Sequence, residues 1–148
     1  ENNFAINTLT ILSKLFDSVF GTLNIAGIVI GIFALFVGMF SVANIMFVSV
    51  RERTNIIGIK MAIGAKRWFI LLEILLEAVT LCIVGGLLGI ALVGLATLVL
   101  TYATDFELRL SLQNILIGLF TSVIVGVLAG LIPAMQASRL DPVEAIRK

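Results

Sequence analysis

Three long stretches of the sequence contain no charged residue, and they limit the folds that the chain can adopt. They cover residues 18–50, 78–104 and 110–138, which are 33, 27 and 29 residues long. About 20 apolar residues in a helix cross the ~30 Å of hydrocarbon in a bilayer. None of the stretches alternates with the two-residue period of a barrel strand. The sequence therefore predicts an all-α integral membrane protein with transmembrane helices at 25–50, 68–100 and 112–133.

The composition excludes several classes of protein. Hydrophobic residues make up 60 % of the chain and charged residues only 13 %, which excludes a soluble globular domain and a disordered tail. The single cysteine, Cys82, cannot form an internal disulfide. The absence of histidine removes His-based acid–base catalysis and most zinc sites. We therefore expect no catalytic residue, no metal site and no cofactor on this chain, and no nucleic-acid partner.

The distribution of charge predicts the orientation of the three helices. Residues 51–68 carry five basic side chains against one acidic side chain, whereas residues 101–111 carry a single arginine. Lys and Arg are enriched in cytoplasmic loops, so residues 51–67 and the tail at 134–148 are expected in the cytoplasm. The N-terminal segment and the loop at 101–111 are then expected outside. A chain that starts outside without a signal peptide is expected to be the C-terminal part of a longer polypeptide.

The first apolar stretch is too long for one bilayer crossing. As a helix, residues 18–50 would extend ~50 Å at ~1.5 Å per residue, against the ~30 Å of hydrocarbon. Upstream, apolar residues recur at three- and four-residue spacings: Ile6, Leu9, Leu12, Leu15, Phe16, Val19, Phe20 and Leu23. This pattern predicts an amphipathic helix. We interpret residues 1–24 as a stalk standing outside the membrane, with a helix lying flat on the membrane as the alternative.

The loop at 51–67 predicts a short helix on the cytoplasmic side. Asn55 is a candidate N-cap, and Gly64 can end the helix in the left-handed conformation. The helix is mostly apolar, so it could lie on anionic headgroups or dock into a groove of a partner. The segment from Gly58 to Lys66 does not fit a phosphate loop, because its glycine spacing and its Arg67 depart from the required pattern.

Two carboxylates and three pairs of glycines also stand out. Glu73 and Glu77 lie one helical turn apart near the start of the second span, where a structural role is favoured over a proton relay. Glycines four residues apart let helix backbones approach closely and predict a tightly packed bundle, within one chain or between two. These pairs are Gly27 and Gly31, Gly85 and Gly89, and Gly126 and Gly130.

The tail carries a helix-start signal, with Asp141 as N-cap, Pro142 at the first position and Glu144 at the third. We expect a short helix there. It either ends in solvent or makes a second contact with the partner of the first cytoplasmic helix.

Two motifs give the chain a family resemblance. Residues 52–65 read E-R-T-x-x-I-G-I-x-x-A-x-G-A, and residues 139–145 read R-L-D-P-V-E-A. With the spans between them, they resemble the C-terminal half of the FtsX-like permease domain of ABC transporters. The likeness is closest to MacB-type efflux permeases and lipoprotein-release permeases. Asn55 and Ile56 stand where relatives often have a charged residue.

The resemblance implies a part of a four-span, dimeric permease in the bacterial cytoplasmic (inner) membrane. It implies that an ABC ATPase, fused or separate, holds ATP and Mg, and that its movement is transmitted to an extracytoplasmic domain. A periplasmic adaptor and an outer-membrane channel are possible further partners. The implied ATPase-coupling residues are Arg51, Glu52, Arg53, Thr54, Ile57, Gly58, Lys60, Met61, Gly64 and Ala65, with a tail contact at Arg139, Asp141, Pro142 and Glu144.

The resemblance leaves more than one function open. Efflux of drugs or peptides and export of lipoproteins are the leading expectation. A regulatory permease that controls a cell-wall hydrolase or senses an antibiotic is the alternative within the family. A membrane anchor or scaffold without energy coupling is the alternative from another class.

Overall fold

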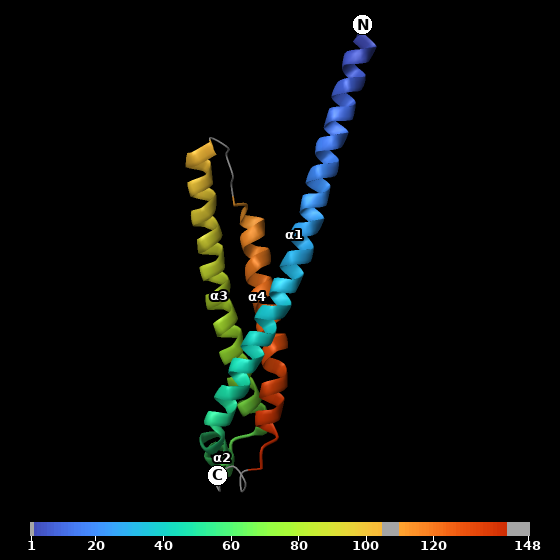
Figure 1. Cartoon of the computed structure of the whole chain (residues 1–148). Helices are drawn as coiled ribbons and strands as arrows, with labels where there is room; N and C mark the ends of the chain where they lie inside the picture. Colours follow the sequence, from blue (N-terminus) through green and yellow to red (C-terminus); the bar gives the residue numbers. More distant parts are fainter. Residues whose placement is uncertain (1, 105–109, 142–148) are drawn as a thin grey trace. The chain divides into compact units, whose positions relative to one another are not determined.

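The computed structural model describes residues 2–104 and 110–141, and the side chains of residues 10–103 and 110–141. Four helices occupy these ranges: α1 (Asn2–Glu52), α2 (Thr54–Ala62), α3 (Arg67–Thr104) and α4 (Leu112–Ser138) (Figure 1). No strand occurs in this part of the chain. The prediction of an all-α fold is therefore confirmed.

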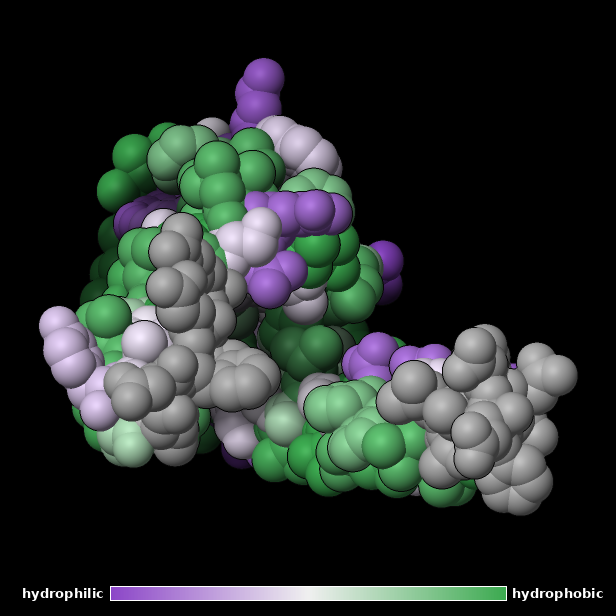
Figure 2. All heavy atoms as spheres, turned by 90° about the horizontal axis from the view of Figure 1, so that it is seen from above, coloured by the Kyte–Doolittle hydropathy of each residue, from purple (hydrophilic) through white to green (hydrophobic). Residues whose placement is uncertain are grey.

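Three of the helices are long and apolar enough to cross a membrane, over Thr10–Glu52, Arg67–Ala103 and Leu112–Ser138. The most apolar stretches of α1 and α3 have none of their residues buried inside the chain. Apolar side chains cover most of the helix surface visible in Figure 2. An exposed apolar surface of this extent needs lipid or another membrane helix around it. The chain is a multi-pass membrane protein.

The chain divides into two units, Glu1–Val37 and Gly38–Lys148. The described part of the first unit is entirely helical and belongs to α1. From Thr10 onward, both the apolar side chains of the expected stripe and the polar side chains between them are exposed. The helix expected in this segment is present over residues 2–24. Its role as a stalk stays a prediction.

The second unit contains the end of α1, together with α2, α3 and α4. Figure 1 shows α3 and α4 running antiparallel, with α2 at the end where α3 begins and α4 finishes. We call this the α2 end. A core of buried residues lies here and joins all four helices: Met46, Ile57, Ile70, Ile74, Ala78, Ala134 and Ala137. The long helices are thus tied together at the end that the charge pattern assigns to the cytoplasm.

Small residues allow α3 and α4 to approach closely. A Cβ atom added at Gly126 would lie 2.8 Å from the Cα atom of Val79, and one added at Gly130 would lie 2.6 Å from the Cβ atom of Ala78. Lipid offers little hydrophobic gain for helix association, so close van der Waals contact carries this packing. Around Gly27, Gly31, Gly85 and Gly89, by contrast, an added Cβ atom would meet nothing within 4 Å.

The helix α4 continues past Pro133, the predicted end of the third span, as far as Ser138, and the boundary of the span itself stays a prediction. Pro133 is fully buried, and Ala134 and Ala137 lie in the core of the α2 end. Proline in a helix removes one backbone hydrogen bond and costs ~3 kcal/mol or more in a soluble helix. In membrane helices, neighbouring groups often offset this loss. Packing of the residues that follow Pro133 maintains the helix beyond it.

Candidate functional site

A single residue separates α1 from α2. Arg53 is the N-cap of α2, with φ −97° and ψ 8°, and its side chain makes no capping hydrogen bond. Its backbone N–H donates to the carbonyl of Ser49 (3.1 Å), and its carbonyl accepts from the N–H of Ile57 (2.9 Å). The expected cap at Asn55 is wrong, because the helix already begins at Thr54. The Thr54 hydroxyl instead donates back to the Val50 carbonyl of α1 (3.0 Å).

The other end of α2 follows the sequence prediction. Gly64 has a φ of +105°, in the region that side chains with a Cβ atom rarely adopt. The Gly64 N–H donates to the Met61 carbonyl and the Ala65 N–H donates to the Lys60 carbonyl, both at 3.0 Å. This pair of bonds is the Schellman motif that closes a helix on glycine. It turns the chain toward α3, which begins at Arg67.

One side of α2 packs on the core of the α2 end. Ile57 and Gly58 are buried, and Met61 is half-buried beside them. Ala65, in the turn after the helix, also packs against this core. Four of the residues assigned to ATPase coupling by the resemblance therefore lie inward.

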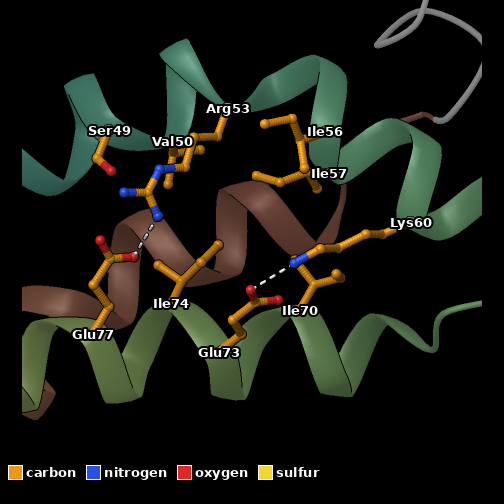
Figure 3. Close-up of a pocket in the computed structure, with 10 residues that line it drawn as sticks. All are labelled: Ser49, Val50, Arg53, Ile56, Ile57, Lys60, Ile70, Glu73, Ile74 and Glu77. Carbon is orange, nitrogen blue, oxygen red and sulfur yellow. Dashed lines mark hydrogen bonds and ion pairs between the residues drawn. The ribbon is translucent and has the colours of Figure 1, made fainter.

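Two ion pairs join the α1–α2 segment to α3. Lys60 Nζ lies 2.6 Å from Glu73 Oε1, and Arg53 Nη1 lies 3.3 Å from Glu77 Oε2 (Figure 3). The four side chains are between 34 % and 57 % exposed. Pairs with this exposure each contribute about 0.2–1 kcal/mol. Together with the inward apolar contacts, they orient α2 relative to α3.

The ion pairs cross a cleft of about 260 Å³ between the α1–α2 segment and α3. Its apolar wall includes Val50, Ile57, Ile70 and Ile74, with the hydroxyl-bearing Ser49 at one side. The labelled side chains of both helices point into the space between the ribbons (Figure 3). The Nζ of Lys60 donates to the Glu73 carboxylate, so the structure gives Glu73 a partner on α2.

The side of α2 away from the cleft presents two isoleucines to its surroundings. Ile59 and Ile63 are 45 % and 83 % exposed, and their four-residue spacing puts them on one face of the helix. Ile56 is also 55 % exposed, but it lines the cleft. Arg51 and Glu52, at the end of α1, are also exposed. We call Ile59 and Ile63 the outer face of α2.

The tail lies only partly within the described residues. Arg139 is exposed and is the C-cap of α4, and Asp141 is exposed two residues later. Pro142 and Glu144, and the helix expected after Asp141, lie outside the described residues. Among those that are described, no group of His, Cys, Asp and Glu side chains could hold a metal ion.

The comparisons with known proteins agree with this architecture. The FtsX-like permease C-terminal family matches residues 28–142. The macrolide export ATP-binding/permease protein MacB of Neisseria gonorrhoeae is 39 % identical over 145 residues, which cover 97 % of this chain and 22 % of that protein. MacB of Shewanella oneidensis is 42 % identical over 149 residues, covering 100 % of this chain and 23 % of that protein.

MacB of Campylobacter jejuni is 43 % identical over 120 residues, which cover 80 % of this chain and 19 % of that protein. The chain thus spans only about a fifth of the length of the curated relatives it matches. A match over most of the chain, on a fold with three membrane helices and a short helix between the first two, establishes the family. This chain belongs to the FtsX-like permease family and forms a C-terminal permease segment.

Proposed function

We propose that this segment couples ATP hydrolysis by a cytoplasmic ABC ATPase to movement of an extracytoplasmic domain, for the efflux of drugs or peptides or the export of lipoproteins. The family and the printed names of the MacB relatives, which join an ATP-binding part to a permease part, support this proposal. The ATPase, with its ATP and Mg, lies on a fused or separate domain outside this chain. The assembly is a dimer in the bacterial inner membrane.

The observation that carries the proposal is the two-sided character of α2. Its inner side is held by buried Ile57 and by the Lys60–Glu73 ion pair, while its outer face exposes Ile59 and Ile63. An exposed apolar helix face beside a basic loop suits a groove on a partner protein, with the isoleucines as anchors. Because α2 would contact the ATPase with one face and its own chain with the other, it can transmit a displacement of the ATPase to the membrane helices.

Two connections lead away from α2. The one-residue turn at Arg53 connects it to α1. The ion pairs and the apolar contacts connect it to α3. A displacement of α2 would therefore reach α1 and α3 at the α2 end. We infer that α2 and the adjoining ends of α1 and α3 move largely as one body during the ATPase cycle.

The test substitutes the outer face in the full-length protein that contains this chain. Ile59→Glu should leave the thermal unfolding of the detergent-purified protein nearly unchanged, because the side chain is exposed. The substitution should lower the affinity of the ATPase for the permease by about tenfold or more, as expected for loss of an apolar anchor. Coupling is measured as the change in ATPase rate caused by the permease. Ile59→Leu is the matched control.

Unchanged coupling in Ile59→Glu and Ile63→Glu would argue against docking and favour α2 lying on the membrane surface. Recovery of no ATPase with the unsubstituted full-length protein would favour a scaffold instead. Gly58 is a poor position for this test, because it is buried and a larger side chain there would disturb the packing of α2.

A further inference from the structure

The two ion pairs that hold α2 against α3 also line a cleft behind α2. It contains two cations, Arg53 and Lys60, and two carboxylates, Glu73 and Glu77, above an apolar wall. We propose that this cleft binds the headgroup of a zwitterionic membrane phospholipid that carries a primary ammonium group. The phosphate would lie against the two basic side chains, and the ammonium would lie against the two carboxylates.

The balance of charge favours a ligand without net charge. The four charged side chains of the cleft sum to zero, whereas the whole loop at 51–67 has five basic residues and one acidic residue. The loop as a whole therefore attracts anionic lipid. Inside the cleft, an anionic headgroup would gain two cations but would also face two carboxylates. A zwitterion satisfies both signs at once.

The donors and acceptors also match such a headgroup. A primary ammonium has three N–H donors, and a carboxylate accepts through two oxygens. A guanidinium can bind two oxygens of a phosphate in its fork geometry. A trimethylated ammonium has no N–H and could not donate to Glu73 or Glu77. Because the four side chains are between 34 % and 57 % exposed, a headgroup can reach them.

The size and the place of the cleft agree with a headgroup. Its volume of about 260 Å³ has room for a headgroup-sized ligand. On the same α1 and α3 segments, Ile45, Val48 and Leu76 are exposed large apolar residues, along which acyl chains could lie. The cleft thus stands where charged side chains meet a lipid-facing surface.

The test compares two lipids that differ only in the methylation of the amine. The full-length protein is delipidated in detergent and titrated with phosphatidylethanolamine or phosphatidylcholine of the same chains, and bound lipid is counted by native mass spectrometry. We expect phosphatidylethanolamine to bind about tenfold or more tightly, because charge-assisted hydrogen bonds are lost on methylation. Glu73→Gln/Glu77→Gln should remove this preference, whereas Glu52→Gln, an exposed carboxylate outside the cleft lining, should keep it.

A second variant separates binding from loss of the ion pairs. Ser49→Phe places a ring in the cleft and leaves all four charged side chains in position, so it should also reduce phosphatidylethanolamine binding. Equal binding of the two lipids would overturn the proposal. So would an unchanged preference in both Ser49→Phe and the double glutamine variant, or tighter binding of phosphatidylglycerol than of phosphatidylethanolamine. The measurement is independent of ATPase coupling, so the two proposals can fail separately.

Discussion

Arg53 Nη1 lies 3.3 Å from Glu77 Oε2, and this ion pair joins the turn between α1 and α2 to the third turn of α3. The two residues are 24 positions apart in the chain. Arg53 is therefore both the N-cap of α2 and a contact to another helix. The family resemblance implies a role for Arg53 in ATPase coupling, yet its side chain already pairs with Glu77 of the same chain.

Reversal of one charge in this pair should destabilise the α2 end, and exchange of both should restore it. We expect Arg53→Glu and Glu77→Arg each to lower the free energy of unfolding, because like charges would then face each other. The double exchange should recover a coupling energy of about 0.2–1 kcal/mol, typical of an exposed pair. A double-mutant cycle on thermal unfolding in detergent measures it.

The same exchange distinguishes two roles of Arg53. If Arg53 acts only by holding α2 against α3, the double exchange restores both stability and ATPase coupling. If its guanidinium also contacts the ATPase, stability returns and coupling does not. Additive single effects in the cycle would mean that the pair contributes nothing measurable.

Much of the fold could be predicted from the sequence because it depends on local patterns. The charge-free stretches alone define three membrane helices, since length and apolarity determine whether a helix can span a bilayer. Gly64 could be predicted as a helix end because the left-handed conformation favours one residue type. Asn55 failed as a cap because Arg53 takes the N-cap position and α2 already begins at Thr54, whose hydroxyl bonds back to the Val50 carbonyl.

The site was less predictable because its pairings depend on how helices lie beside one another. A structural role for Glu73 and Glu77 could be predicted from the sequence, but their partners could not. The pairing of Arg53 with Glu77 and of Lys60 with Glu73 depends on how the α1–α2 segment lies beside α3. The three glycine pairs look alike in sequence, yet only Gly126 and Gly130 lie in a close α3–α4 contact.

Alanine at Gly130 should separate α3 from α4. The added Cβ atom would lie 2.6 Å from the Cβ atom of Ala78, so one backbone must shift. Overpacking of this kind costs ~1–3 kcal/mol. Gly89→Ala is the matched control, because its Cβ atom would meet nothing within 4 Å. Thermal unfolding of the two variants checks the difference, and equal stability would contradict the packing described here.

Met46 should hold the end of α1 on the core of the α2 end. Its side chain is 1 % exposed, whereas that of the neighbouring Ile45 is 60 % exposed. We expect Met46→Ala to lower the free energy of unfolding by an amount near the lower end of the ~2–5 kcal/mol found in soluble cores. Lipid reduces the free energy gained by burying an apolar side chain, but the cavity left by the substitution still costs stability. Ile45→Ala should be nearly neutral. Similar losses in the two variants would show that α1 is not anchored through Met46.

Gly64→Ala should disrupt the closing turn of α2 without any steric clash. No atom lies within 4 Å of the added Cβ atom, so the expected loss of ~1–2 kcal/mol comes from the φ of +105° alone. Gly38→Ala, in the open interior of α1, is a control of opposite sign, since alanine is favoured over glycine by ~0.5–1 kcal/mol inside a helix. Because the turn sets the path from α2 to α3, Gly64→Ala should also lower ATPase coupling in the full-length protein. Coupling that stays normal despite the lost stability would mean that the orientation of α2 does not depend on its Schellman motif.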